Sequence, residues 1–536
     1  MFVTGDADMD LLALLAIVNS APFRALLTLQ MAFGSYEVGV VQRTPVPTLG
    51  DNDAQALAAL AREAHDRKRE ADRDDEVTHP FTAPALLRHT VAPAPAAVVG
   101  PQATYPSLAA AFGALLAEDA ARDQRLAAIQ REVDDICFRL YGFSAADRAE
   151  IERASSTPAQ APSAEGDASG RADAASEGAS ENEGENEGEN DSEDDGEAAA
   201  PATTGKRRAL HDEIGNLLMY AVGCAFGRWD ARIGRDPSLA PALADPFAPL
   251  PVCAPGTLVG PDGLPARKDA IASEAWLRAR PNAITLPEPG SVVGPGAITA
   301  NDYPLPVAWD GILVDDPDAD NDIVRRVRAA LDALYGDASG QGDQADAIEA
   351  EACALLGARD LREYFRNPRL FFDHHISRYS KSRRKAPIYW LLQSSRRSYG
   401  LWLYYHRLDA DLIFKAINFH LLPRLRLEEQ RLDELTTAKQ QAGATGPEAR
   451  RLAQALDRQQ ALLGELRDFH DALDRAARLY LTPDLNDGVL LNIAPYHEVV
   501  SWRKEAKAAW EQLLAGKYEW SSIGRQLRDK GLVKAR

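Results

Sequence analysis

Apolar residues recur at three- and four-residue steps along most of this chain, the spacing that gives an α-helix one apolar face. Near the start, this pattern predicts a helix over residues 7–32 that Pro22 interrupts, a charged amphipathic helix over 51–75, and two helices within 107–153. Further helices are predicted over residues 209–232, 322–335 and 345–356. Much of the chain is therefore expected to be α-helical.

The longest helical pattern covers residues 409–480. Leucines repeat at helical steps in two runs that Ala442–Gly446 joins, and Pro423 is expected to kink the first run. Two such runs with a short Gly-containing connection predict a helical hairpin of coiled-coil type.

Short apolar runs predict a few strands. Val38, Val40 and Val41 alternate with other residues and stop before two prolines, which predicts a short strand. KAPIYWLLQS and YGLWLYYH, within residues 385–406, suit two strands or a strand and the start of a helix, and the Pro- and Gly-rich residues 235–310 suit loops with a few strands. The expected fold is mainly α with small mixed α/β portions.

The net charge of −20 is concentrated in one segment. Residues 163–200 hold fourteen acidic residues and one basic residue, which leaves a net charge of −7 for the rest of the chain. The repeat-like centre has no aliphatic residue larger than Ala, so residues 154–206 are expected to be a disordered acidic linker. A DNA-mimicking autoinhibitory tail is the alternative. The acidic balance therefore does not argue against a polyanionic partner for the folded parts.

The four cysteines lie far apart and none has C-x-x-C spacing, which indicates neither a zinc ribbon nor a disulfide framework. No apolar run approaches the roughly 20 residues that span a bilayer. The first residues, MFVTGDADMD, lack the basic start of a signal peptide. We therefore expect a cytoplasmic location and no membrane partner.

One stretch, Phe365–Arg407, reverses the acidic balance. With Arg362 just upstream it holds eleven basic residues against Glu363 and Asp373, and ten aromatic residues are interleaved. Positive charge mixed with planar side chains suits a phosphate-rich ligand. The side chains expected to contact the phosphates of such a ligand are those of Arg378, Lys381, Arg383, Arg384, Lys385, Arg396, Arg397 and Arg407.

Two alternatives apply to this basic-aromatic stretch. Its charges could form a solvated face that pairs with acids elsewhere in the chain. Its aromatic residues Tyr389, Trp402 and Tyr404 are individually expected in the core rather than on a ligand.

Catalytic motifs are sparse. An adenine methyltransferase needs a Gly-rich turn for its cofactor and an Asn/Asp-Pro-Pro-aromatic motif for the target amine, and the sequence contains neither G-x-G-x-x-G nor NPPY, NPPF or DPPY. Asp373-His374-His375 has few acids nearby to complete a metal site. Pro261-Asp262 and Pro483-Asp484 lack the other parts of a PD-(D/E)xK nuclease motif. We therefore expect no catalytic or metal-binding residue in this chain.

Several stretches together resemble a known family. They are YAVGCAFGRW at Tyr220–Trp229, DGILVDDPDADNDIVRRVRAALDALYG at Asp310–Gly336, the run from Leu361 to Leu425 that contains KAPIYWLLQS and YYHR, and LNDGVLLNIAPYH in the tail. In this order they resemble the C-terminal half of the adenine-specific DNA methyltransferases of BREX (bacteriophage exclusion, PglX-like) systems, relatives of type IIG restriction-modification enzymes. LLALLAIVNSAPFRALLTLQMAFGSYEVGVVQRTPVP resembles the segment that those enzymes place beyond their catalytic domain. The family's catalytic half has no counterpart in this sequence, so no catalytic residue is carried over.

The resemblance implies the DNA-binding, target-recognition portion of an adenine-specific DNA methyltransferase used in phage defence. Double-stranded DNA is the expected partner, together with a separate catalytic chain that holds S-adenosylmethionine, or other defence proteins. The isolated chain, a split subunit or a truncated gene product, is expected to be inactive and to hold no cofactor. The alternative is a non-enzymatic scaffold subunit that does not bind DNA.

The expected domain division has five parts. They are a helical, post-catalytic block with a short strand at 1–153, the linker at 154–206, an α/β DNA-recognition region at 207–408, the helical hairpin at 409–480 and a small helical region at 481–536.

Overall fold

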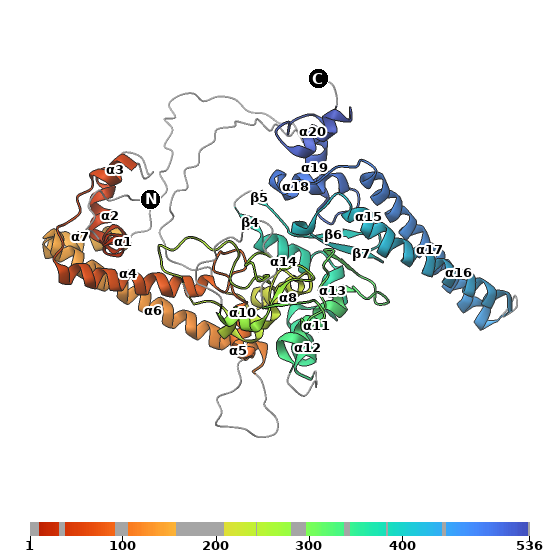
Figure 1. The fold of residues 1–536 in the computed structure, drawn as a ribbon, viewed down its shortest axis with the longest axis horizontal. Helices are drawn as coiled ribbons and strands as arrows, with labels where there is room; N and C mark the ends of the chain where they lie inside the picture. Colours follow the sequence, from red (N-terminus) through yellow and green to blue (C-terminus); the bar gives the residue numbers. More distant parts are fainter. Residues whose placement is uncertain are drawn as a thin grey trace, which may run out of the picture. The chain divides into compact units, whose positions relative to one another are not determined.

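The chain folds mainly into α-helices, and the strands in the described part are short and form three small sheets (Figure 1). This confirms the expected fold class. The computed structural model describes residues 10–31, 38–91, 106–156, 208–242, 244–279, 296–336, 343–381, 384–441 and 446–533. Residues 157–206 of the predicted acidic linker lie outside this described part.

Two compact units make up the chain, one of residues 1–67 and 120–207, the other of residues 68–119 and 208–536. The boundaries fall inside two long helices, α4 (Asp51–Asp72) and α6 (Leu108–Tyr141). The first unit also contains α1 (Leu11–Asn19), α2 (Ala21–Thr28), α3 (Val38–Arg43) and α7 (Ala145–Ser156). The five-part division expected from the sequence stays a prediction.

The first unit has its own core, in which Ile17, Phe23, Leu57 and Cys137 are buried. The break predicted near Pro22 falls at Ser20, whose hydroxyl accepts a hydrogen bond from the Phe23 N–H at 3.4 Å. Pro22 is tolerated in the first turn of α2 because a backbone N–H at position 22 would have no acceptor within the helix. Among the described helices none is long and apolar enough by itself to cross a membrane, while α1 and α2 together, bent by 64°, meet the same criteria of length and composition.

The strand predicted at Val38, Val40 and Val41 is wrong, because these residues form α3. No described strand of the first unit lies there to pair with, and an unpaired strand leaves its backbone groups unsatisfied. A helical turn satisfies them internally, and the Thr44 side chain adds a hydrogen bond to the Val40 carbonyl at 3.0 Å. Of the three valines only Val40 is fully buried, so their spacing in the sequence was a misleading indication of a strand.

The second unit is built around a three-stranded antiparallel sheet. Its strands are β3 (Ile312–Val314), β7 (Gly400–Tyr404) and β6 (Tyr389–Gln393), in the order β3-β7-β6. Every residue of the three strands is buried, which explains why β6 and β7 are continuously apolar and aromatic instead of alternating. Of the two alternatives for this stretch, two strands or a strand and the start of a helix, the structure has the two strands. Tyr389 pairs with Tyr404 at one end of the β6–β7 hairpin, and Gln393 pairs with Gly400 at the other.

Several helices share a hydrophobic core with this sheet (Figure 1). They include α8 (Leu210–Ala225), α11 (Ile323–Tyr335), α12 (Asp343–Leu356), α13 (Leu361–Arg366) and α14 (Phe371–Arg378). The smaller elements of this part are α5 (Ala85–Thr90), α9 (Ala231–Arg235), α10 (Glu274–Ala279), β1 (Ile271–Ala272), β2 (Ala297–Ile298), β4 (Ser380–Lys381) and β5 (Arg384–Lys385). Gly223 allows the Trp229 ring to approach α8 closely, since a Cβ at position 223 would lie 2.3 Å from Cδ1 of Trp229.

The predicted helical hairpin is confirmed as α16 (Leu422–Gln441) and α17 (Pro447–Ala477), which lie side by side (Figure 1). The kink expected at Pro423 is a π-helical turn, Ile417–Leu421, between α15 (Leu412–Ala416) and α16. Pro423 has no N–H to donate to the helix and lies two residues after that turn. The tail folds into α18 (Val489–Ile493), α19 (Arg503–Leu514) and α20 (Ser522–Asp529) around a small apolar core.

Candidate nucleic-acid interface

The β6–β7 hairpin separates the basic residues predicted to bind DNA into two groups. Arg378 and the β4–β5 pair precede β6, and Arg407 follows β7, so these residues belong to the Tyr389–Tyr404 end. Arg396 and Arg397 lie in the loop at the opposite end. The five residues of β6 put roughly 13 Å between the two ends. The predicted residues thus do not form one continuous patch by strand order.

The placement of the β4–β5 residues is known only in part. Lys381 pairs through its backbone with Arg384, and Ser380 pairs with Lys385. Arg383 lies outside the described residues. The role of these basic residues stays a prediction.

Three predicted DNA contacts have partners inside the protein. The Arg378 guanidinium forms an ion pair with Asp75, and the Lys385 ammonium lies 3.6 Å from a carboxylate oxygen of Glu505. Arg407 donates to the Ala266 carbonyl at 3.3 Å, and its guanidinium lies 5.8 Å from the Trp309 ring centroid. A phosphate would have to compete with these contacts.

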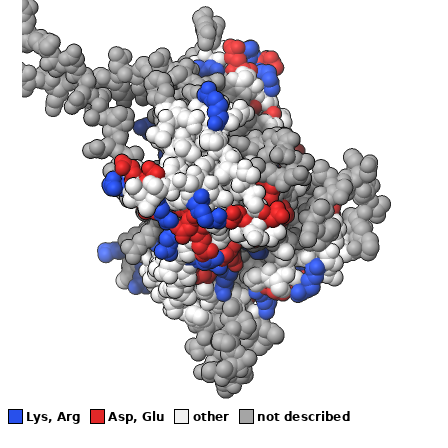
Figure 2. Space-filling model, turned by 90° about the vertical axis from the view of Figure 1, so that its left-hand side faces the viewer, with Lys and Arg blue, Asp and Glu red and all other residues white. Residues whose placement is uncertain are grey.

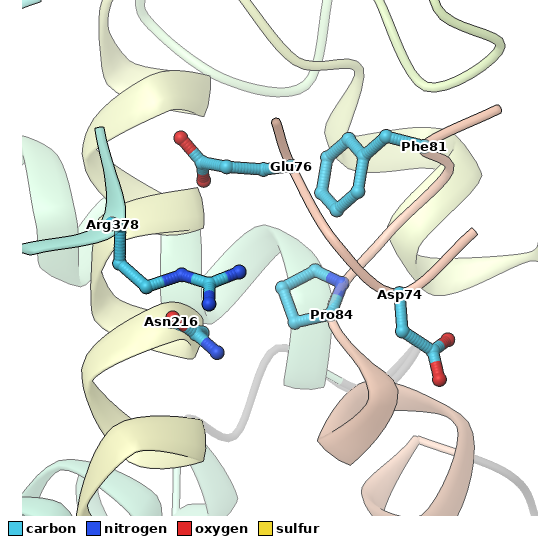
Figure 3. Close-up of a pocket in the computed structure, with 6 residues that line it drawn as sticks. All are labelled: Asp74, Glu76, Phe81, Pro84, Asn216 and Arg378. Atoms are coloured by element: carbon cyan, nitrogen blue, oxygen red, sulfur yellow. The ribbon is translucent and has the colours of Figure 1, made fainter. Parts of the chain in front are cut away.

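Arg378 also lines a closely packed hollow. Figure 3 shows its side chain beside Asn216 and pointing toward Pro84. The space has no room for a water molecule. Glu76, on the wall of this hollow, accepts hydrogen bonds from Arg228 and from the Tyr379 hydroxyl, and burial raises the pKa of its carboxyl group. The hollow is therefore a buried polar contact that holds segments together, rather than a ligand site.

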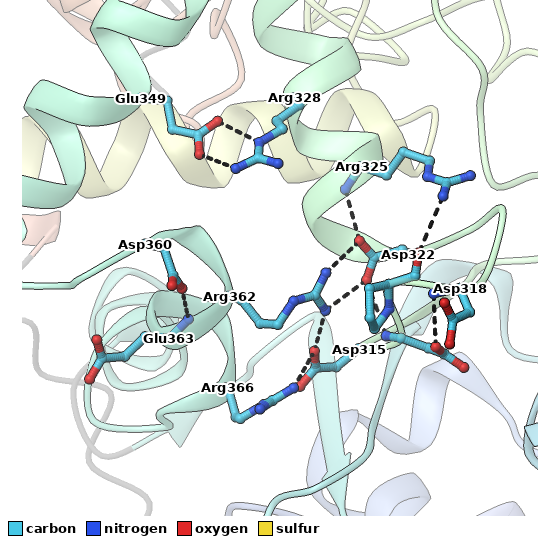
Figure 4. A network of polar contacts seen from close by, with 12 residues as sticks. Asp315, Asp318, Asp322, Arg325, Arg328, Glu349, Asp360, Arg362, Glu363 and Arg366 are labelled. Atoms are coloured by element: carbon cyan, nitrogen blue, oxygen red, sulfur yellow. Dashed lines mark hydrogen bonds and ion pairs between the residues drawn. The ribbon is translucent and has the colours of Figure 1, made fainter. Parts of the chain in front are cut away.

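Two further arginines of the basic-aromatic stretch form an internal network (Figure 4). Arg362 donates to Asp315 at 2.6 Å and to Asp322 at 2.9 and 3.0 Å, and Arg366 donates to Asp315 at 2.6 and 3.0 Å. Both aspartates are buried, and the Asp322 carboxylate also caps the start of α11. The acids that neutralise these arginines come from the segment just after β3, which sequence proximity does not reveal.

The hairpin loop Ser394–Tyr399 is different, because its two arginines are free. Arg396 and Arg397 are exposed, and neither side chain has an ion pair or hydrogen bond with a described residue. The Arg397 N–H donates to the Ser394 carbonyl at 2.9 Å, and the Ser394 N–H donates to the Tyr399 carbonyl at 3.0 Å. The loop is therefore a fixed turn that exposes two adjacent positive charges.

Arg397 adopts a left-handed backbone conformation, with φ 61°. This region costs a residue with a Cβ roughly 1–2 kcal/mol, and Gly would occupy it with little strain. Non-Gly residues held in this region cluster at functional sites. An arginine at such a position is consistent with a side chain kept for binding.

A third exposed arginine, Arg369, is connected to the base of this loop through one hydrogen bond and a short run of chain. Gln393, the last residue of β6, donates from Nε2 to the Arg366 carbonyl at 2.8 Å. Arg369 follows three residues later, is exposed and has no side-chain partner among the described residues. Arg369 is therefore a further candidate for contact with a polyanion.

Glu465 of α17 anchors the loop, and sequence reasoning did not identify it. Its carboxylate is buried and accepts hydrogen bonds from the hydroxyls of Ser394 and Ser398 and from the N–H groups of Arg396 at 2.8 Å and Ser398 at 3.2 Å. Burial raises the pKa of Glu465, but these hydrogen bonds outweigh burial, so its pKa is lowered. No signal in the sequence separates Glu465 from the other glutamates of the hairpin helices.

Nine of the ten aromatic residues of the stretch are buried in the core, including Tyr389, Trp402 and Tyr404 as expected, and Tyr379 is partly buried against it. His374 and His375 are buried too, and burial lowers the pKa of His374 to about 4 and that of His375 well below its usual value. His375 accepts hydrogen bonds from two backbone N–H groups at the start of β6. Within the described residues no group of three or more His, Cys, Asp or Glu side chains could hold a metal ion.

The aspartates of the two nuclease-like motifs have local structural partners. Asp262 accepts a hydrogen bond from the Leu264 N–H at 3.1 Å, and Asp484 accepts one from the Asn486 N–H at 2.9 Å. Each carboxylate thus stabilises its own turn.

Two hollows of the described part do not suit S-adenosylmethionine, and the first, beside Arg378, has no room for a water molecule. A second hollow, an open groove of about 330 Å³, is lined by α12 and the residues after it, including Glu349, Cys353 and Asp360. It contains no aromatic ring to stack on an adenine. No chemical step in this chain is therefore assigned to that cofactor.

Surface charge is mixed on one face of the molecule. On the face drawn in Figure 2, basic and acidic side chains lie next to each other among the coloured residues. The Ser394–Tyr399 loop is the candidate site for a polyanion because its two unpaired arginines lie on a turn that hydrogen bonds hold in place.

Comparison with known proteins gives weak but consistent similarities. The chain is 25% identical over 208 residues to the adenine-specific methyltransferase BrxX of Escherichia coli O9:H4 (strain HS), and 26% identical over 226 residues to the adenine-specific methyltransferase PglX of Lacticaseibacillus casei (strain Zhang). No family model matches the chain. The alignments cover 37% and 39% of this chain but 16% and 18% of the two relatives, so the chain spans less than a fifth of the length of each. The chain is thus related to adenine-specific methyltransferases of this kind.

Proposed function

We propose that this chain is the DNA-binding and target-recognition portion of an adenine-specific DNA methyltransferase that acts in phage defence, of the BREX or restriction-modification kind. One observation carries the proposal: two exposed, unpaired arginines, Arg396 and Arg397, on a fixed hairpin loop. The similarity to two adenine-specific methyltransferases supports the choice of DNA as the polyanion. The matched region corresponds to the C-terminal half of such enzymes in this proposal.

The proposed role is to hold duplex DNA while another domain does the chemistry. Arg396 and Arg397 bind backbone phosphates, which fixes the position of the duplex without reading its sequence. A target adenine is inaccessible inside the helix, so a methyltransferase must flip it into its own pocket. In this proposal that pocket, with S-adenosylmethionine, belongs to a catalytic domain on a separate chain.

A second candidate function is a scaffold subunit of a defence complex that does not bind DNA. The internal partners of Arg378, Lys385 and Arg407 favour it, because they reduce the positive charge available to a polyanion. The two candidates differ in whether the isolated chain binds a duplex.

Binding of the full chain to a random-sequence duplex, measured over a series of salt concentrations, separates them. Each phosphate neutralised by Lys or Arg contributes about −0.9 to the slope of log K against log salt. We expect a slope of about −2 or steeper, and no methyl transfer by the chain alone with labelled S-adenosylmethionine. No measurable binding at low salt would reject the DNA-binding role in favour of the scaffold.

Substitution of Arg397 separates binding from folding. Arg397→Gly relieves the left-handed strain and removes the charge, so we expect an unfolding free energy unchanged or raised by up to about 1 kcal/mol, with DNA affinity reduced several-fold. Arg397→Ala keeps the strain and removes the same charge, so it should lose affinity equally without any gain in stability. Urea denaturation and duplex titration of the two variants measure both quantities. Wild-type affinity in Arg397→Gly would remove this side chain from the interface.

A further inference from the structure

Glu465 links the helical hairpin to the arginine loop through a single buried carboxylate. We propose that Glu465 is a positioning residue whose carboxylate holds the Ser394–Tyr399 loop in the conformation that presents Arg396 and Arg397 to DNA phosphates. This proposal rests on the proposed DNA-binding function and assigns a role in it to α17.

The hydrogen bonds explain how one side chain orders the loop. Oε1 accepts from the Ser394 hydroxyl, the Arg396 N–H and the Ser398 N–H, while Oε2 accepts from the Ser398 hydroxyl at 2.7 Å. The donors are alternate residues of the loop, so the chain curls around the carboxylate. Without this acceptor, two backbone N–H groups of a short loop would lose their partner.

A second contact from the same helix supports the first. The Phe469 ring meets the Tyr399 ring edge-on, with centroids 6.3 Å apart. Residues 465 and 469 are four apart, so they lie on the same face of α17. The helix therefore holds the loop at Tyr399 as well as through Glu465, and both Tyr399 and Phe469 are buried.

The Glu465 carboxylate stays ionised at neutral pH. Burial disfavours the ionised form, yet the serine hydroxyls and the two backbone N–H groups stabilise it more, so the pKa lies below its usual value. No ion pair joins Glu465 to either loop arginine in the described structure. The carboxylate thus uses the backbone of the loop and leaves both guanidinium groups available.

The positioning role and simple electrostatics predict opposite changes in DNA affinity when Glu465 is removed. A buried negative charge near two DNA-binding arginines weakens their attraction for phosphate if charge is all that matters. Its removal would then tighten binding. If Glu465 positions the loop, its removal weakens binding because the arginines lose their fixed arrangement.

The test compares Glu465→Ala and Glu465→Gln in the full chain, with a random-sequence duplex at low salt. We expect Glu465→Ala to bind about 10-fold more weakly, because two phosphate contacts lose their fixed geometry. Gln can still accept at one oxygen and donate to Ser398, so Glu465→Gln should bind within about twofold of wild type. Binding by Glu465→Ala as tight as wild type, or tighter, would overturn the proposal.

Glu428→Ala is the matched control. Glu428 is a buried glutamate of the same hairpin, in α16, and its partners are Arg424, Arg431 and Gln459, with no contact to the loop. We expect its DNA affinity to stay within about twofold of wild type. An equal loss in Glu428→Ala would assign the effect to general loosening of the hairpin and overturn the specific role of Glu465.

Hydrogen exchange of the loop amides tests positioning without DNA. The N–H groups of Arg396 and Ser398 should exchange slowly in wild type and Glu465→Gln and much faster in Glu465→Ala. Unchanged exchange in Glu465→Ala would overturn the positioning role, whatever the DNA result. A wild-type chain that fails to bind DNA would instead overturn the proposed function, so the two failures are distinguishable.

Discussion

Changing Arg396 and Arg397 together to Ala is expected to lower the affinity of the chain for duplex DNA by about 10- to 100-fold at low salt. The two side chains are exposed and have no partner among the described residues, so the change removes two charges without breaking an internal contact. The slope of log K against log salt should become shallower by about 2, because two fewer counterions are released. Titrations at several salt concentrations measure both effects.

Arg450→Ala with Arg451→Ala is the control for this double substitution. This pair is also adjacent and exposed and has no side-chain partner in the described part, but it lies near the start of α17. It is about 20 Å along the helix from Glu465 at 1.5 Å per residue. We expect this control to change affinity less than threefold. Equal losses for the two pairs would mean that total charge, rather than the loop, determines binding.

Asp315→Ala is expected to reduce the stability of the second unit by about 2–4 kcal/mol. Asp315 is buried and accepts hydrogen bonds from both Arg362 and Arg366, so its loss leaves two guanidinium groups without a shared acceptor. Both arginines keep some exposure and can recover part of their hydration, which limits the loss. All eight tryptophans belong to the second unit, so tryptophan fluorescence during urea denaturation reports its unfolding.

Asp320→Ala is the matched control in the same loop. Asp320 is fully exposed, and its ion pair with Arg325 spans 3.4 Å at the surface. Surface pairs of this kind contribute little, so a change below about 0.5 kcal/mol is expected. A urea midpoint for Asp315→Ala equal to that of wild type would show that the network in Figure 4 does not stabilise the unit.

The long elements could be predicted because their patterns are regular over many residues. The leucine repeats of α16 and α17 and the amphipathic pattern of α11 specify helices by themselves. The apolar runs of β6 and β7 are so short that the sequence left open whether each forms a strand or the start of a helix. In the structure both are strands, and every residue in them is buried. The strand predicted at Val38–Val41 was wrong because a local pattern cannot supply the neighbouring strand with which a strand must pair.

The candidate site was harder to predict because basic residues look alike in a sequence. Arg366 and Arg397 both belong to the same positive stretch, yet one lies against a buried aspartate 51 residues away and the other is free. Which arginine is neutralised depends on where β3 places Asp315, and that is a property of the sheet. Glu465 is 69 residues from Arg396, and only the packing of α17 brings the carboxylate to the loop.

Within the basic-aromatic stretch of about forty residues, the Ser394–Tyr399 loop is the best-supported part of the proposed interface, and the roles of Lys381, Arg383 and Arg384 stay predictions. Arg378, Lys385 and Arg407 have structural partners, whereas Arg396 and Arg397 are positioned by contacts that leave their guanidinium groups available. In the proposed function, the ligand of this loop is duplex DNA.

The most direct test of this account is a photo-crosslink from the loop itself. Exposed Ser395, just before the two arginines, would be replaced by p-benzoylphenylalanine, with Arg451 replaced in the same way as the control. The account predicts a DNA adduct from position 395 that unlabelled duplex competes away and that exceeds the adduct from position 451. DNA binding without a crosslink from position 395, or with equal crosslinking from both positions, would contradict it.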